Sequence, residues 1–95
     1  MMSDFEIRRG ELRDLESLVA FNQGIARETE GLELDATILS AGLRRMLESE
    51  GLGFYLVATC EDQVAGCLMV TFEWSDWRNA TFWWVQSVYV QKDFR

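Results

Sequence analysis

The chain has 95 residues, enough for one small domain, and 48% of them are hydrophobic, so a core can form. Its formal net charge of −7 disfavours nucleic acid and anionic membrane surfaces as partners. The acidity is compatible with a cationic substrate such as an amine, or it simply keeps an aromatic-rich protein in solution. The absence of histidine excludes Ser-His-Asp triads, Cys-His pairs and histidine metal sites.

No signal peptide or membrane span is recognisable, because the N-terminus is polar and acidic and no apolar run approaches about 20 residues. We therefore expect a cytoplasmic protein without a metal site. Its two cysteines flank a short turn. If residues 62–63 form that turn, Cys60 lies opposite Ala65 and Cys67 opposite Ala58, so we expect two free, buried thiols and no disulfide.

The N-terminal third predicts a strand and a helix. Residues 5–8 alternate apolar and polar side chains, as in a half-buried strand that ends at Gly10. Residues 12–28 carry an apolar stripe at helical spacing. The stripe consists of Leu15, Leu18, Val19, Asn22, Ile25 and Ala26. Asn22 interrupts it, either as a buried hydrogen-bonding residue or as the point where the helix crosses a polar site.

An acidic loop separates this helix from a second one. Gly31 suits a left-handed helix cap. Glu28, Glu30 and Glu33 are either a solvated acidic loop or three carboxylates that attract an ammonium group. Asp35 suits the N-cap of a helix over residues 36–48. Its stripe is Leu39, Gly42, Leu43, Met46 and Leu47, in which the glycine is expected to allow close packing.

From residue 54 the hydrophobic period changes to two. Residues 54–60, 64–74 and 81–90 are predicted strands of an antiparallel meander, with turns at 61–63 and 75–80. Gly66 marks either a bulge or a close backbone approach. The run over 81–90 is apolar on both faces, so it is expected inside the sheet and not at its edge. The order β-α-α-β-β-β predicts an α+β fold with helices packed on an antiparallel sheet.

Three segments with this element order resemble the N-terminal half of the GNAT superfamily of N-acetyltransferases. Ile7-Arg8-Arg9 followed by Asp14-Leu15 is similar to the family's first strand and helix. Val64-Ala65-Gly66 resembles its V-x-G strand, and Gln86 to Val90 followed by Gln91 to Arg95 resembles its fourth strand and the start of its acetyl-CoA motif. In the family such an arginine opens an Arg-x-x-Gly-x-Gly/Ala loop. The resemblance implies that residues 1–95 are a single GNAT-type domain truncated before that pyrophosphate-binding loop.

The resemblance also implies an activity and a set of site residues. The family transfers acetyl from acetyl-CoA to a primary amine by direct attack. Backbone groups of Val88, Tyr89 and Val90, together with Arg95, would bind the cofactor, with donors aimed at the developing oxyanion. The Trp-rich turn and the acidic loop look closest to the diamine- and polyamine-type enzymes, in which the acceptor is a small molecule. Homodimers are common in the family.

The roles of the remaining residues follow from an alignment of Gln86 with a carboxylate of related enzymes. Gln86 cannot be a base, so it would orient the amine or a water molecule. Glu30 or Glu33 would then take the proton through water. The expected substrate-binding residues are Glu28, Glu30, Glu33 and Trp84.

Two other interpretations remain open. A non-catalytic half-domain would dimerise through the strand over 82–90, because an apolar edge strand recruits another chain. A cage for an ammonium group would use Trp74, Trp77, Trp83 and Trp84. However, Trp83 and Trp84 are expected on opposite faces and cannot share one cage.

Overall fold

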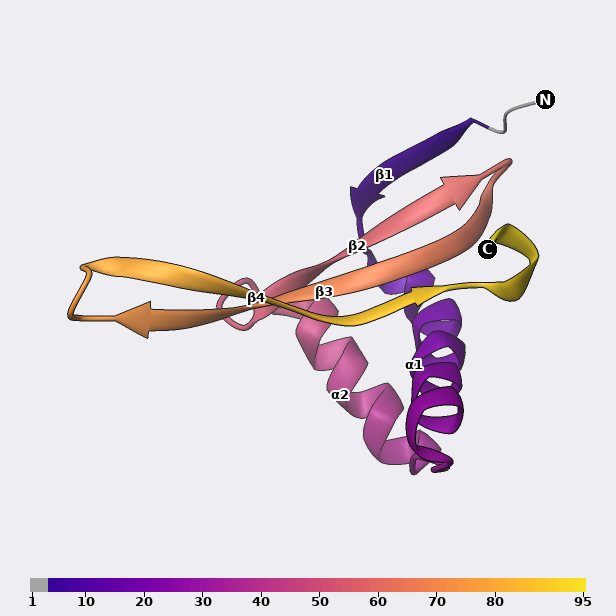
Figure 1. Cartoon of the computed structure of the whole chain (residues 1–95), viewed down its shortest axis with the longest axis horizontal. Helices are drawn as coiled ribbons and strands as arrows, with labels where there is room; N and C mark the ends of the chain where they lie inside the picture. The colour runs from indigo at the N-terminus through magenta and orange to yellow at the C-terminus, as the bar shows by residue number, and fades with distance from the viewer. Residues whose placement is uncertain (1–3) are drawn as a thin grey trace.

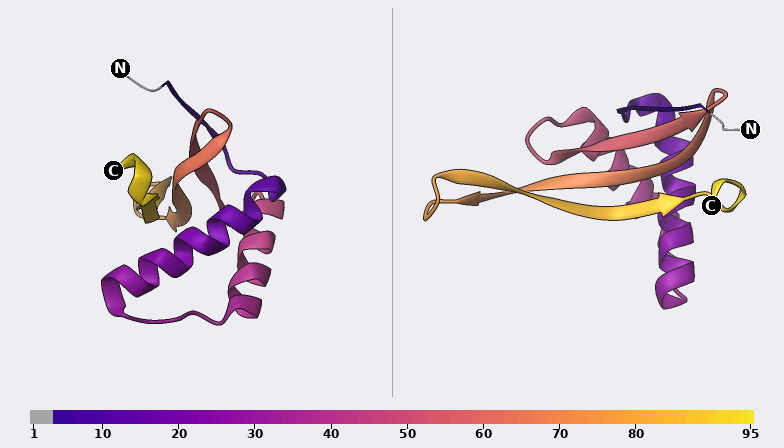
Figure 2. Two further views of the ribbon diagram at one scale, coloured as in Figure 1. Left: turned by 90° about the vertical axis from the view of Figure 1, so that its right-hand side faces the viewer. Right: turned by 45° about the horizontal axis from the view of Figure 1, so that its top comes forward.

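The computed structural model describes residues 4–95. It shows a four-stranded antiparallel sheet with two helices on one of its faces (Figures 1 and 2). This confirms the predicted α+β fold and its element order. In chain order the elements are β1 (Phe5–Arg9), the 3-10 helix η1 (Leu12–Asp14), α1 (Leu15–Glu30), α2 (Ala36–Glu48), β2 (Gly53–Cys60), β3 (Gln63–Ser75), β4 (Ala80–Val90) and the 3-10 helix η2 (Lys92–Phe94).

The helix ends follow the predicted caps, although the first helix is divided. Residues 12–14 form η1, and α1 begins only at Leu15, because the Asp14 carboxylate is held by the backbone N–H of Glu11 at 2.7 Å. Gly31 ends α1 in a left-handed conformation with φ of 64°. At the start of α2, the Asp35 side chain accepts a hydrogen bond from the Ile38 N–H at 3.0 Å.

The core lies between the sheet and the two helices. Its buried side chains are Leu18, Phe21, Leu43, Met46, Tyr55, Val57 and Cys67. Asn22 donates to the Leu18 carbonyl at 2.9 Å and to the Tyr55 hydroxyl at 3.1 Å, so it is the hydrogen-bonding residue of the first alternative. Gly42 does not pack closely as expected, because it is exposed and a Cβ there would meet nothing within 4 Å.

Both cysteines are free and buried, as predicted, but the expected register around them is wrong. The tight turn uses residues 61–62, which both adopt positive φ, so Cys60 pairs with Gln63. A register shift after Ala58 then places Cys67 opposite Val57. The prediction started the turn one residue too late and could not foresee the shift.

The strand order is β1-β2-β3-β4, so β4 is an edge strand and the expectation of an interior position is wrong for the described residues. Its apolar side chains serve two different surfaces. Trp83 packs edge-on against Phe54 and tilted against Phe72 on the face away from the helices, whereas Trp84 lies on the helix side with Glu73. Their opposite directions were predicted.

The hairpin of β3 and β4 extends well beyond β2. The partner of Thr71 is Gly53, the first residue of β2, so residues 72–83 form a two-stranded ribbon that projects from the sheet (Figure 1). Trp77 at its tip is 96% exposed.

Among residues 4–95, no helix has both the length and the apolar character that crossing a membrane requires.

Candidate functional site

A bulge near the end of β4 is the most distinctive backbone feature of the sheet. Tyr89 pairs with Cys67 and Gln86 pairs with Met69, so two residues, Ser87 and Val88, lie opposite one residue of β3. Ser87 has φ of 52°, a left-handed conformation that is uncommon outside glycine. The ladder is interrupted here, and the outer edge of β4 has no strand partner within the described chain. Backbone donors and acceptors are thus turned away from the regular sheet.

Gly66 allows the strands to approach closely beside this bulge. A Cβ at residue 66 would lie 2.7 Å from the Tyr89 carbonyl oxygen, which is closer than real Cβ contacts. Both expectations for this glycine are met, because β4 approaches closely here and the pairing of β3 with β2 skips Ala65, the residue beside Gly66. The V-x-G pattern fits its surroundings because β4 comes too near for any side chain.

Two buried polar side chains of the neighbouring strands, Tyr55 and Cys67, form hydrogen bonds with Ser87 in the bulge. Tyr55 is 2% exposed, and burial raises the pKa of its hydroxyl, although hydrogen bonds with Asn22 and Ser87 act in the opposite direction. Cys67 Sγ donates to the Ser87 carbonyl at 3.5 Å, and burial raises the pKa of this thiol to about 11. Cys67 is therefore a neutral thiol near pH 7 and not an activated nucleophile.

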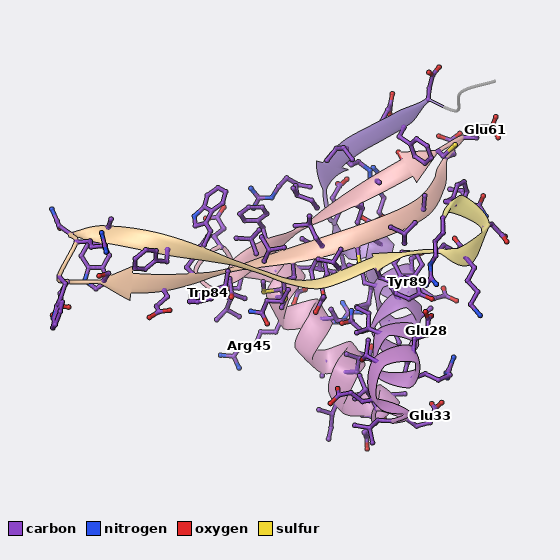
Figure 3. All side chains as sticks on the ribbon, viewed as in Figure 1. Glu28, Glu33, Arg45, Glu61, Trp84 and Tyr89 are labelled. Atoms are coloured by element: carbon purple, nitrogen blue, oxygen red, sulfur yellow. The ribbon has the colours of Figure 1, made fainter. Side chains whose placement is uncertain are left out.

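The Tyr89 side chain extends from the bulge to α1. Its ring packs on Phe21 with centroids 5.2 Å apart, and it crosses α1 at Gly24, where a Cβ would lie 2.7 Å from the phenol oxygen. Its hydroxyl donates to Glu28 Oε2 at 2.8 Å, and this carboxylate raises the pKa of Tyr89 (Figure 3). The tyrosine thus connects the end of β4 to the last turns of α1.

Arg95 completes this cluster. Its guanidinium donates to Glu28 Oε1 at 2.9 Å and to the Val90 carbonyl at 2.6 Å, and it lies 5.1 Å from the Tyr89 ring centroid. Hydrogen bonds from Tyr89 and Arg95 lower the pKa of Glu28, which keeps its carboxylate charged. The cluster borders a cleft of about 370 Å³. The cleft is lined by Ile25, Glu28, Thr29, Val88, Tyr89, Val90 and Arg95.

The structure brings the expected cofactor residues together with one expected substrate residue, but it separates the others. Both oxygens of Glu28 are engaged by Tyr89 and Arg95. Glu33 pairs with Arg27 at 3.0 Å at the far end of α1. In Figure 3, Trp84 lies far along β4 from Glu28 and Glu33.

The remaining expected residues are exposed. Gln86 donates through its amide nitrogen to the Thr71 hydroxyl at 2.6 Å. Glu30 is the last residue of α1, and within the described residues its side chain forms no hydrogen bond with Gln86. The predicted roles of these two residues stay predictions.

Sequence reasoning missed Glu73. Its carboxylate Oε1 accepts a hydrogen bond from the Trp84 indole N–H at 2.6 Å, on the helix side of the projecting ribbon. The alternation of β3 and β4 contained the signal, because Thr71 pairs with Trp84 and Glu73 is the next residue on the same face. The register is unbroken from the turn to Gln86, and the predicted turn over residues 75–80 gives the same pairs, so this signal was available in the sequence.

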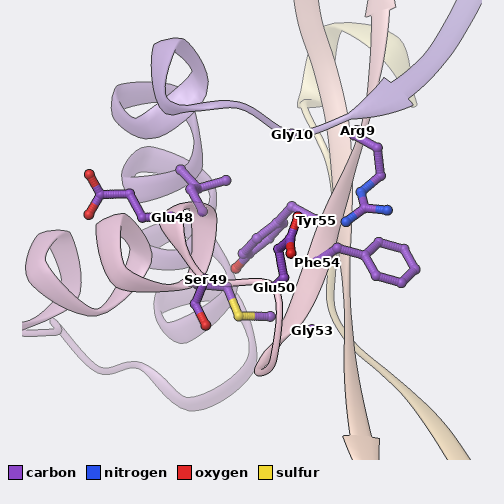
Figure 4. A pocket seen from close by; sticks show the side chains of 10 residues that line it. Arg9, Gly10, Glu48, Ser49, Glu50, Gly53, Phe54 and Tyr55 are labelled. Atoms are coloured by element: carbon purple, nitrogen blue, oxygen red, sulfur yellow. The ribbon is translucent and has the colours of Figure 1, made fainter.

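A second hollow of about 360 Å³ lies between the end of α2 and the start of β2 (Figure 4). Arg9, Glu48 and Glu50 border it, and the Arg9 guanidinium lies 4.2 Å from the Phe54 ring centroid.

Throughout residues 4–95, no group of three or more acidic, cysteine or histidine side chains could hold a metal ion.

Comparison with solved structures identifies the fold. A protein from Clostridium difficile 630 described as a possible acetyltransferase superposes with a TM-score of 0.93 and is 47% identical over 96% of this chain and 60% of its own. A predicted acetyltransferase from Clostridium acetobutylicum, solved with acetyl-CoA, gives a TM-score of 0.75 at 15% identity, covering 95% of this chain and 62% of its own. A GNAT family acetyltransferase from Staphylococcus aureus gives 0.69 at 20% identity, covering 99% and 67%.

No family model and no curated protein matches the chain. The structural likeness nevertheless shows that residues 4–95 have the fold of the GNAT N-acetyltransferases, as the sequence motifs predicted. The chain spans about 60% of the length of the first two of these structures.

Proposed function

We propose that this protein transfers the acetyl group of acetyl-CoA to a primary amine of a small molecule. The observation that carries the proposal is the bulge at Ser87 and Val88, which turns backbone groups of an edge strand away from the ladder. Backbone donors fixed in this way can polarise a thioester carbonyl and stabilise the oxyanion that forms on it. The likeness to acetyltransferase structures supports the same reaction.

The proposed reaction is a direct displacement. The lone pair of the neutral amine forms a bond with the acetyl carbon, the carbon–sulfur bond breaks, and the thiolate of CoA leaves. The new amide nitrogen then loses its proton. Gln86 is suited to orient the amine with its carbonyl oxygen, because its amide nitrogen already donates to Thr71. Glu30 would receive the proton through water.

The residues around the cleft fit the pantetheine arm of acetyl-CoA and the phosphates at its far end from the thioester. Val88, Val90 and Ile25 provide apolar contacts for a pantetheine chain, and Arg95 provides a positive charge for its phosphates. Arg95 is held against Glu28 and Tyr89, so we propose that Glu28 positions the cofactor side of the site and is not the ammonium receptor that the sequence suggested.

Gly66→Ala tests the proposal. The added methyl group would push against the Tyr89 carbonyl and shift the bulge, and a displacement of this kind typically costs tenfold or more in rate, so kcat/KM for acetyl transfer should fall by about tenfold or more. Release of free thiol from acetyl-CoA in the presence of a panel of primary amines gives the rate. Gly51→Ala is the matched control, because a Cβ at residue 51 meets nothing within 4 Å. Unchanged turnover in Gly66→Ala, or no turnover with any amine, would count against the proposal.

A second candidate function is a non-catalytic half-domain that pairs with its own copy through β4. The favouring observation is that residues 80–90 contain no charged side chain, although edge strands are normally protected by charge. Val85 is 61% exposed on this strand. Sedimentation equilibrium should then give a dimer for the native chain and a monomer for Val85→Lys. A native monomer that acetylates amines would exclude this candidate.

A further inference from the structure

We infer that Glu73 and Trp84 form a binding site for a second, non-reacting ammonium group of the acceptor, so that the acceptor is an extended diamine or polyamine. The inference rests on the proposed acetyl transfer and specifies its substrate class. None of the residues expected from the sequence to attract an amine, apart from Trp84, takes part.

The carboxylates that were expected to bind the amine are largely engaged elsewhere. Glu28 accepts from Tyr89 and Arg95, and Glu33 pairs with Arg27. Glu73 differs from Glu28 and Glu33, because no basic side chain lies within ion-pair distance of it in the part of the chain that the structure describes. Glu30 has no ion pair there either, but it lies at the end of α1, whereas the Trp84 indole holds Glu73 on the sheet. The charge of Glu73 is therefore available to a ligand cation.

Aromatic rings flank this carboxylate. The Trp84 indole N–H holds one Glu73 oxygen at 2.6 Å, and Trp84 is 56% exposed. Phe82, the cross-strand partner of Glu73, extends to the same side of the ribbon and is also exposed. Phe82 already receives a cation, since the Arg78 guanidinium lies 5.9 Å from its ring centroid. A carboxylate fixed beside exposed aromatic rings is suited to bind an ammonium group, because the carboxylate and the ring faces both attract a cation.

The position of the pair relative to the bulge sets the length of the acceptor. Trp84 and Ser87 are three residues apart on β4, and Gln86, which is suited to orient the reacting amine, lies between them. At about 3.3 Å per residue this separation is roughly 10 Å. An extended chain advances about 1.2 Å per bond, so roughly eight bonds would separate the two nitrogens. The net charge of −7 attracts such a dication to the protein.

A binding experiment on the 95-residue chain tests the site without requiring turnover. The Trp84 indole N–H resonance, assigned with Trp84→Phe, is followed during titration with heptamethylenediamine, trimethylenediamine and heptylamine. We expect a saturable shift with heptamethylenediamine and at least tenfold weaker binding of the other two. Glu73→Gln should weaken heptamethylenediamine binding at least tenfold.

Glu61→Gln is the matched control, because it removes the same charge from an exposed turn at the opposite end of β3 (Figure 3). Its affinity should remain within twofold of the native chain. Equal weakening by both variants, or no saturable shift in the native chain, would overturn the inference, since only a general attraction to negative charge would remain.

The acetyl-transfer assay separates this inference from the function on which it rests. Turnover of heptylamine and heptamethylenediamine with equal kcat/KM would overturn the Glu73 site and leave acetyl transfer in place. Specific binding of the diamine without any acetylation would retain the site and overturn the proposed enzyme function.

Discussion

Gly53→Ala is expected to destabilise the fold by about 4 kcal/mol, a large part of the 5–15 kcal/mol that holds a typical domain together. Gly53 begins β2 with φ of 143°, a conformation that side-chain-bearing residues rarely adopt. A Cβ there would run into the Val70 carbonyl oxygen of the neighbouring strand and approach Met46 Cε to 2.8 Å. Because the first obstacle is backbone, relief requires β2 and β3 to separate.

Urea denaturation followed by tryptophan fluorescence gives the free energy of unfolding for this test. Gly51→Ala, two residues earlier, serves as the control and should stay within about 0.5 kcal/mol of the native chain, because the position is open and exposed. A Gly53→Ala variant as stable as the control would show that β2 can begin in an ordinary strand conformation.

The elements were predictable because their signals are local. The period of α2, its Asp35 cap and the Gly31 left-handed residue all depend on neighbours within a few positions. The register was not predictable, because the shifts at Ala58 and at Ser87 depend on which strand lies opposite. Within the described residues β4 has a strand neighbour on one side alone, which the composition of residues 81–90 could not show.

The candidate site shows the same division. The family motifs selected Val88, Tyr89, Val90 and Arg95 as cofactor residues, and all four line one cleft. The contacts of Tyr89 and Arg95 with Glu28 span 61 and 67 residues of sequence, so no local pattern could show that this carboxylate is engaged. Glu73 was missed because its proposed role depends on the hydrogen bond with Trp84 on the neighbouring strand.

Asp14→Ala is expected to cost about 3–5 kcal/mol of stability at pH 7. Asp14 is 3% exposed, and the Arg8 guanidinium holds both of its oxygens at 2.8 Å. The Glu11 N–H adds a third hydrogen bond at 2.7 Å. Removing the carboxylate leaves the guanidinium without its main partner at the junction of β1 and α1. Glu11→Gln should lose less than about 1 kcal/mol, because its ion pairs with Arg8 at 3.4 Å and with Arg13 at 2.9 Å are both on the surface.

The pH dependence follows from the direction of the pKa shift. Burial alone would raise the pKa of Asp14, but the hydrogen bonds from Arg8 and from the Glu11 N–H outweigh it, so the pKa in the folded state lies below its ordinary value of 3.8. The unfolded chain then binds the proton more readily, and the stabilisation is fully present above pH 3.8 and is lost as the pH falls through the folded-state pKa. The difference in unfolding free energy between the native chain and Asp14→Asn should therefore be constant near neutrality and shrink in acid. A difference that persists unchanged at acidic pH would mean that shape, and not the charge of the carboxylate, anchors Arg8.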